Sequence, residues 1–123
     1  MAKRRITNAL KRGEVYLVSF DPTVGAEIKK IRPALVLQND VANRHSAVTI
    51  VAAISSRIDE SLYPTEVAVV PPEGGLTKQS VVLLNQVRTV DKRRLAARLG
   101  MLAPETMQRV DRALEVSLGL VEI

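Results

Sequence analysis

Polar side chains that can bind a phosphate stand at the ends of several predicted strands. They are two arginines, two serines and three side-chain amides: Arg32, Asn39, Ser55, Ser56, Asn85, Gln86 and Arg88. A guanidinium presents planar, paired donors that match phosphate oxygens, and a hydroxyl can donate to the same group. From composition and pattern alone, the plainer interpretation is ordinary polarity at a sheet rim, for example an ion pair between Arg32 and Asp21 or Glu27.

Other familiar catalytic and metal-binding chemistry is poorly represented in the sequence. The chain has no cysteine and one histidine, His45, which stands in a polar segment. A His/Cys metal cluster is therefore excluded, and no carboxylate cluster has metal-ligand spacing. Gly74-Gly75 lacks the lysine and the strand–helix setting of a phosphate-binding loop. A solvated His45 is the more common case than a catalytic one, and we expect neither a metal nor a cofactor.

The composition is that of one folded, basic domain. The chain has 123 residues, of which 46% are hydrophobic and 25% charged, as in ordinary globular proteins. A net charge of +5 favours a polyanionic partner, either nucleic acid or an acidic peptide. Only Tyr16, Phe20 and Tyr63 are aromatic, too few for a base-stacking platform. The lack of cysteine, of a signal peptide and of a membrane-spanning run fits a cytoplasmic protein.

Runs rich in strand-forming residues predict a mainly β chain. We predict strands over residues 14–20, 32–38, 47–54, 65–69 and 80–90, and a further short strand over 97–101. The run Ala34–Leu37 is unbroken and apolar, which indicates burial on both faces. Several short strands without a βαβ pattern indicate a small, largely antiparallel barrel with helical attachments.

The remaining segments are predicted as connections and short helices. Residues 1–12 form a basic N-terminal arm before a single domain over 13–123, and residues 39–46 and 71–75 form a polar connection and a turn. Asp91 can cap a helical turn over 92–95. Met107, Val110, Leu114 and Leu118 recur at intervals of three and four. This spacing predicts an amphipathic helix that begins at Pro104 and ends near Gly119.

Five blocks of the sequence resemble the MazF/PemK family of toxin endoribonucleases. These blocks cover residues 12–16, 21–27, 31–40, 51–55 and 83–95, and the likeness extends from about residue 12 to the C-terminus. The resemblance implies an SH3-like (CcdB/MazF-like) small β-barrel with a C-terminal helix, present as a homodimer. It implies the toxin of a toxin–antitoxin system, which cuts single-stranded RNA sequence-specifically and without a metal. It also implies a cognate antitoxin whose acidic segment occupies the RNA groove.

The resemblance assigns catalytic roles to Arg32 of the Arg-Pro block and to Ser55 after the Ala-Ala-Ile block. Ser55 stands where the family has threonine. The change keeps the hydroxyl but loses the methyl that restricts χ1, and we expect activity to survive. In the implied reaction the RNA 2′-OH attacks the adjacent phosphorus and leaves a 2′,3′-cyclic phosphate and a 5′-OH. A guanidinium suits the developing charge but is a poor base, so Arg32 is assigned to charge stabilisation and the general acid and base stay unassigned.

The loops over residues 21–31 and 55–64 are expected to flank the groove and to read bases. The residues predicted to contact RNA are Glu27, Lys29, Lys30, Asn39, Ser56, Gln86 and Arg88. Ile28-Lys29-Lys30 replaces the family's frequent Gln-Gly-Gly, and Asn85 stands where glutamate is common, so no target sequence is carried over. Two alternatives are a non-enzymatic, CcdB-like toxin that binds DNA gyrase and a basic nucleic-acid-binding barrel without chemistry. Arg32 and Ser55 favour the nuclease.

Overall fold

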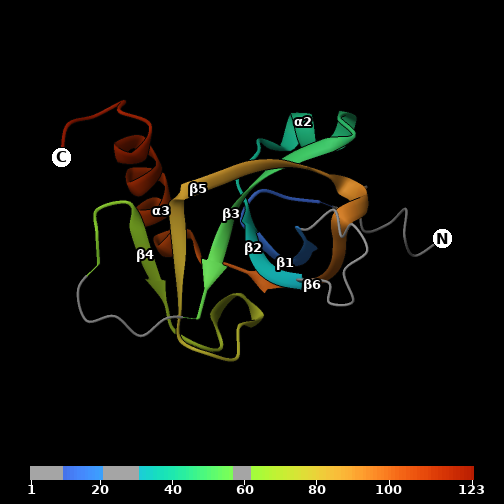
Figure 1. Cartoon of the computed structure of the whole chain (residues 1–123), viewed down its shortest axis with the longest axis horizontal. Coiled ribbons are helices and arrows are strands. Elements are labelled where there is room, and N and C mark those ends of the chain that lie inside the picture. The colour runs from blue at the N-terminus through green and yellow to red at the C-terminus, as the bar shows by residue number, and fades with distance from the viewer. Residues whose placement is uncertain (1–9, 21–30, 57–61) are drawn as a thin grey trace.

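The computed structural model describes residues 10–20, 31–56 and 62–123 (Figure 1). Three of the predicted RNA contacts, Glu27, Lys29 and Lys30, lie outside the described residues, as does Asp21. Within the described residues no helix is long and apolar enough to cross a membrane.

Six antiparallel strands form one curved sheet in the order β4-β5-β3-β2-β1-β6. The strands are β1 (Glu14–Ser19), β2 (Ile31–Val36), β3 (Val48–Ser55), β4 (Glu66–Val69), β5 (Ser80–Asp91) and β6 (Leu95–Met101). Two short 3-10 helices, η1 (Glu73–Gly75) and η2 (Lys92–Arg94), and two α-helices, α2 (Asp40–His45) and α3 (Pro104–Ser117), complete the described chain. The predicted mainly β fold with a C-terminal helix is confirmed. Among the described residues no pairing joins β4 to β6, so the sheet is open and not a closed barrel.

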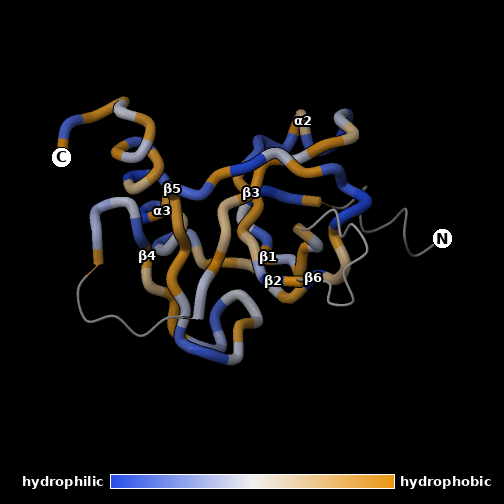
Figure 2. The backbone as a smooth tube through the Cα atoms, viewed as in Figure 1, coloured by the Kyte–Doolittle hydropathy of each residue, from blue (hydrophilic) through white to orange (hydrophobic). Residues whose placement is uncertain are grey.

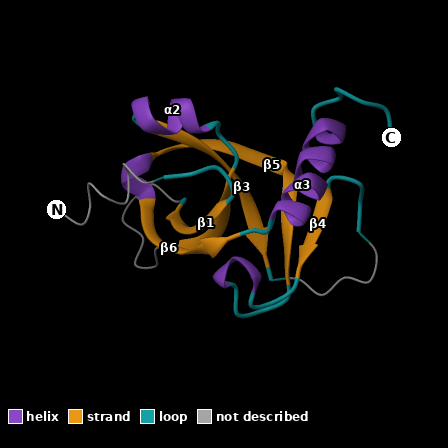
Figure 3. Cartoon of the chain, turned by 180° about the vertical axis from the view of Figure 1, so that it is seen from behind, coloured by secondary structure: helices purple, strands orange, loops and turns teal. Residues whose placement is uncertain are grey.

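The sheet buries apolar side chains on both faces and so has two cores. The helix core lies under α3 and includes Val15, Leu35, Ile54, Val82 and Val110; Figure 3 shows α3 against β4 and β5. The strand core lies on the opposite face and consists of Leu10, Tyr16, Val18, Phe20, Ala34, Val36, Val51, Val90 and Leu95. Successive residues of β1 and β2 alternate between the two cores, because side chains alternate along a strand. This explains the unbroken apolar run Ala34–Leu37, whose four residues are all buried as predicted.

The long strand β5 changes its register on β3 partway along. Residues Val48–Ala52 pair with Val87–Asp91, whereas Ala53–Ser55 pair with Val81–Leu83. Leu84, Asn85 and Gln86 therefore have no partner on β3. Figure 2 shows the apolar first half of β5 and the hydrophilic η2 beyond its end.

An offset of three residues exchanges the two faces of β5, because side chains alternate with a period of two. Before the offset, Val82 and Leu84 pack in the helix core. After it, Val90 packs in the strand core, and Arg88 lies on the same face as Val90. A uniformly paired β5 would place Arg88 on the helix-core face.

Helix α2 lies inside the segment that the sequence predicts to be a polar connection over residues 39–46, so that prediction is wrong for this part. Its N-cap is Asn39, whose Oδ1 accepts a hydrogen bond from Ala42 N at 2.8 Å. The predicted cap of η2 is confirmed, since Asp91 Oδ1 accepts from Arg93 N at 2.8 Å. Helix α3 begins at Pro104 as predicted, and Ala103 supplies no side-chain cap.

The described end of the predicted N-terminal arm is packed on the sheet. Leu10 is buried in the strand core. Arg12 donates from its backbone N to Asp40 Oδ1 at 2.7 Å and from Nε to Leu37 O at 2.8 Å, and its Nη2 lies 2.6 Å from Asp111 Oδ1. Residues 10–12 therefore belong to the folded domain.

Candidate functional site

Arg32 and Ser55 lie at the same end of two neighbouring strands. The β2–β3 ladder pairs Val36 with Val51, Leu35 with Ala52 and Ala34 with Ala53. Arg32 and Ser55 each stand two residues beyond the pair of Ala34 with Ala53. Since residues two apart share a face, both side chains lie on the strand-core face, just past its apolar part. The register thus places the two predicted catalytic residues at the same end of neighbouring strands and on the same face.

The polar groups of this strand end are not used inside the protein. Arg32 is exposed and Ser55 half-buried. Within the described residues, neither the Arg32 guanidinium nor the Ser55 hydroxyl makes a hydrogen bond or ion pair. An unpaired guanidinium beside an unpaired hydroxyl is suited to an anionic ligand with several acceptor oxygens. The predicted alternative, an ion pair of Arg32 with Asp21 or Glu27, lies outside the described residues.

Arg88 is a further arginine on this face, and the β5 offset places it there. It pairs with Val51 of the strand core, four residues along β3 from Ser55, or roughly 13 Å at about 3.3 Å per residue. Its guanidinium carbon lies 4.9 Å from the centroid of the Phe20 ring, a cation–π distance that orients the arginine while leaving its edge donors available. Arg88 can therefore meet a different part of an extended ligand from Arg32. This contact is not predictable from the sequence, in which Phe20 is only an aromatic residue of a predicted strand.

The other predicted RNA-contacting residues fall into two groups. Ser56 is exposed and directly follows Ser55, and Gln86 is exposed in the unpaired segment of β5. Asn39 stands at the opposite end of β2 from Arg32, and its side-chain oxygen accepts the hydrogen bond that caps α2. The structure does not bring Asn39 together with Arg32 and Ser55.

The opposite end of β2 and β3 also carries polar side chains, but these are buried and bonded to one another. Asn43 is fully buried; its Oδ1 accepts from Gln38 Nε2 at 3.0 Å and from Thr49 Oγ1 at 2.9 Å, and its Nδ2 donates to Gln38 O at 2.9 Å. Buried Lys92 donates from Nζ to the carbonyl oxygen of Asn43, and burial lowers the pKa of Lys92. We call Gln38, Asp40, Asn43, Thr49 and Lys92 the α2 network. It fixes α2 on the sheet, and its members are bonded to one another.

Asp40 lies at the half-buried edge of the α2 network. The hydrogen bond from Arg12 N lowers the pKa of Asp40, and a bond from Asn43 Nδ2 at 3.3 Å acts in the same direction. This carboxylate is thereby held ionised while it tethers residue 12 to the start of α2. The role of Asp40 is structural.

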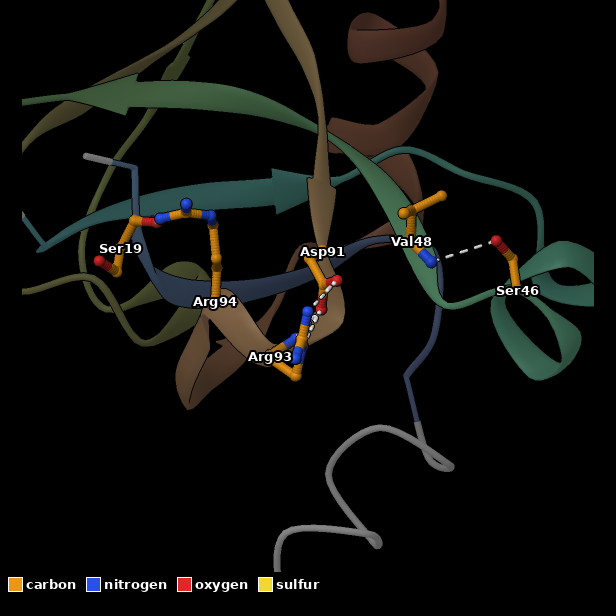
Figure 4. Close-up of polar contacts among 6 residues, drawn as sticks. All are labelled: Ser19, Ser46, Val48, Asp91, Arg93 and Arg94. Carbon is orange, nitrogen blue, oxygen red and sulfur yellow. Dashed lines mark hydrogen bonds and ion pairs between the residues drawn. The ribbon is translucent and has the colours of Figure 1, made fainter. Parts of the chain in front are cut away.

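The basic residues of η2 are partly neutralised (Figure 4). Asp91 accepts from Arg93 Nε at 3.0 Å and from Nη2 at 3.1 Å, and these bonds lower the pKa of Asp91 to about 2. Arg94 donates from Nη1 to Ser19 O at 3.2 Å and ties η2 to the end of β1. The run Lys92-Arg93-Arg94 therefore presents less free positive charge than its sequence suggests. In the described part of the chain no three His, Cys, Asp or Glu side chains are grouped to hold a metal ion.

The fold is a small, basic β protein. At one rim of its sheet stand a guanidinium and a hydroxyl that have no partner among the described residues. Residues 11–118 match the family described as PemK-like, MazF-like toxin of type II toxin-antitoxin system. The chain belongs to this family. The match does not favour the CcdB-like alternative or the barrel without chemistry.

Named relatives agree with this membership. The chain is 44% identical over 113 residues to Endoribonuclease EndoA of Bacillus subtilis (strain 168), with 92% of this chain and 97% of that one covered. Its structure is similar to an endoribonuclease in complex with its cognate antitoxin from a mycobacterial species (TM-score 0.77, 28% identity, 93% and 99% covered). It is also similar to MazE-MazF (Form-II) from Deinococcus radiodurans (TM-score 0.75, 29% identity, 91% and 97% covered).

Proposed function

We propose how this toxin endoribonuclease cuts its substrate: single-stranded RNA lies across the strand-core rim, with the scissile phosphate held by Arg32 and Ser55. The observation that carries the proposal is the pair itself. Both groups stand at one end of β2 and β3, on one face, and neither has a partner among the described residues.

The chemistry follows from the two donors. The 2′-oxygen attacks the adjacent phosphorus, the bond from phosphorus to the 5′-oxygen breaks, and the products are a 2′,3′-cyclic phosphate and a 5′-OH. One proton leaves the 2′-hydroxyl and one is gained by the departing 5′-oxygen. Negative charge grows on the non-bridging oxygens, where the planar donors of Arg32 stabilise it and Ser55 adds a hydrogen bond. This charge stabilisation requires no metal ion.

The remaining contacts extend the site along the RNA. Arg88 lies far enough from Ser55 to bind a neighbouring phosphate or base, and Ser56 and Gln86 stand at the exposed rim. Glu27, Lys29 and Lys30 complete the proposed set from outside the described residues. A polyanionic path of this kind also suits an acidic antitoxin segment, which would compete with RNA for the same arginines.

The proposal includes a homodimer and a cytoplasmic location. Large apolar side chains exposed on the single chain, among them Val87 and Met101, are available for an interface between two copies. Sedimentation or light scattering of the purified protein gives its mass directly. A mass of one chain at micromolar concentration would contradict the dimer.

The test of the reaction uses the purified protein and a long single-stranded RNA in EDTA. We expect cuts at one short motif, with 2′,3′-cyclic phosphate and 5′-OH ends identified by end-specific labelling. Arg32→Ala should abolish these cuts. The control variant Arg112→Ala also removes one positive charge, at an exposed position of α3, and should leave the cuts unchanged. Dispersed cuts, or cuts that survive Arg32→Ala, would refute the assignment. Activity that requires added magnesium would refute the metal-free mechanism.

A further inference from the structure

A cavity opens immediately beside the proposed catalytic pair, but on the other face of the sheet. Its volume is about 340 Å³, within the range of roughly 300–1,000 Å³ that small-ligand sites occupy. Its lining includes Pro33 and Ser56, the residues that directly follow Arg32 and Ser55. Pro33 stands two residues before Leu35, and Ser56 two residues after Ile54, so both lie on the helix-core face.

The cavity has an apolar floor and a polar, basic rim. Leu17, Pro33, Leu76 and Leu99 are the large apolar residues of its lining, and Lys78 is its charged residue. Leu76 is buried in the helix core, whereas Lys78 is exposed. An apolar floor favours a flat group with little charge, and a lysine at the rim favours an anion attached to that group. A nucleotide has both parts, because its base has an apolar π-face and its phosphate is anionic.

The walls of the cavity are fixed before any ligand binds. Ser80 is buried, and its hydroxyl donates to the carbonyl oxygen of Lys78 at 2.9 Å. On the opposite side, Gly75 adopts a φ of 72°, and a Cβ there would collide with the carbonyl group of Leu99. The loop after η1 is thus packed directly on β6. A preformed site of this kind loses little entropy when it binds.

We propose that this cavity binds the base of an RNA nucleotide that flanks the scissile phosphate, and that Lys78 contacts the phosphate of that nucleotide. The inference rests on the proposed function, since it needs the RNA to reach Arg32 and Ser55. Consecutive residues of a strand point to opposite faces. RNA that passes the ends of β2 and β3 can therefore meet Arg32 and Ser55 with a phosphate on one face and reach the cavity with a neighbouring base on the other. The cavity thereby contributes to the choice of the cleaved sequence.

The experiment combines an abasic scan of the substrate with variants that fill the cavity. Short single-stranded RNAs carry the mapped cleavage motif, with the base removed at one position at a time. For the unmodified protein we expect one flanking position at which base removal lowers kcat/KM about 10-fold, the order of one base–protein contact. Thr77→Trp places an indole at the cavity lining from an exposed position. It should lower kcat/KM for the intact RNA to that of the abasic RNA and abolish the penalty at that position alone.

Matched variants separate the cavity from general effects. Gln108→Trp adds the same indole at an exposed position of α3 and should keep the abasic penalty. If Thr77→Trp does not fold, Lys78→Trp can be used to fill the same space. Lys78→Ala tests the phosphate contact and should reduce the salt dependence of RNA binding by about one charge.

The possible failures are distinct. An unmodified protein that does not cut, or whose cuts survive Arg32→Ala, refutes the proposed function. A protein that cuts as proposed but shows the same abasic penalties in Thr77→Trp as in the unmodified chain refutes the base-binding cavity. That second outcome would leave an apolar side chain of a protein partner as the better occupant.

Discussion

The two ends of the β2–β3 pair carry similar side chains and use them in opposite ways. At one end, the amides, hydroxyl and cation of the α2 network are buried and bonded to one another, and Asn43 alone takes part in several hydrogen bonds. At the other end, Arg32 and Ser55 have no partner among the described residues. Residue type alone does not distinguish the two ends. What distinguishes them is whether the donors are hydrogen-bonded within the protein or have no partner among the described residues.

The difference shows how a small sheet divides stability from function. A buried polar group is costly unless it is bonded, so the α2 network contributes to stability only as a complete set. An exposed and unbonded guanidinium contributes little to folding, and its donors remain available to a ligand. Substitutions at the two ends should therefore have separable effects on unfolding and on cleavage.

The largest effect is expected at Arg32. Arg32→Ala should lower the cleavage rate by about 100- to 1,000-fold, the usual loss when one donor to a developing oxyanion is removed. Its free energy of unfolding should stay within about 0.5 kcal/mol of the unmodified protein, because the side chain is exposed. Arg32→Lys keeps the positive charge but loses the planar, paired donors of the guanidinium, so its cleavage rate should remain strongly reduced. Urea unfolding and single-turnover cleavage measure the two quantities, and a clear loss of stability in Arg32→Ala would break the comparison.

Asn43→Ala should produce the converse result. It removes a fully buried amide and leaves Thr49, Gln38 and Asp40 short of partners. The expected loss is about 3 kcal/mol of unfolding free energy. Cleavage per folded molecule, measured well below the unfolding midpoint, should change less than about two-fold. A variant that remained stable but lost activity would move Asn43 into the functional site.

Ser55 tests how much the second donor adds. Ser55→Ala should reduce cleavage by about 10-fold, since one neutral hydrogen bond is weaker than the contacts of a guanidinium. Ser55→Thr restores the hydroxyl with a restricted χ1 and should equal or exceed the unmodified rate. The comparison of the three rates under single-turnover conditions isolates the hydroxyl from the methyl. Equal rates for all three would remove Ser55 from the reaction.

The smallest effect concerns the pH dependence of stability at Asp40. Its pKa is lower in the folded chain than its ordinary value of 3.8. The stabilisation is therefore present above that ordinary value and is lost as the pH falls through the lowered pKa. Asp40→Asn should be slightly less stable than the unmodified protein at neutral pH, and the difference should shrink on acidification. Urea midpoints at about pH 7 and about pH 3 give this difference; one that widened in acid would contradict the assigned sign.

Much of the fold was predictable because alternation and apolar runs report burial directly. The run Ala34–Leu37 predicts a strand buried on both faces, and Asp91 and Pro104 mark helix starts through local chemistry. Helix α2 was missed because its six residues are too few to be stable alone. Distant partners hold it, namely Thr49 and Lys92, and local sequence patterns carry no record of such contacts.

The sequence proposes candidate residues for the site but does not predict their geometry. The family resemblance identifies Arg32 and Ser55. Their common position at one strand end depends on the β2–β3 register, which neither segment determines by itself. Arg88 illustrates the same limit more sharply. Its face depends on an offset between β5 and β3, and neither strand shows this offset in its own pattern. The cavity beside Pro33 and Lys78 gathers residues from several separate segments and has no sequence signature.

The offset in β5 has a consequence for how this chain tolerates insertions and deletions. Leu84, Asn85 and Gln86 are free of β3, so the length of this segment can change while the paired stretches on either side keep their partners. The pairing with β3 sets the face of the following stretch, so Arg88 stays opposite Val51 and beside Phe20 in such variants. The unpaired segment takes up the added or removed residues as a bulge. We therefore expect length variants of this segment to keep RNA binding as long as both paired stretches hold.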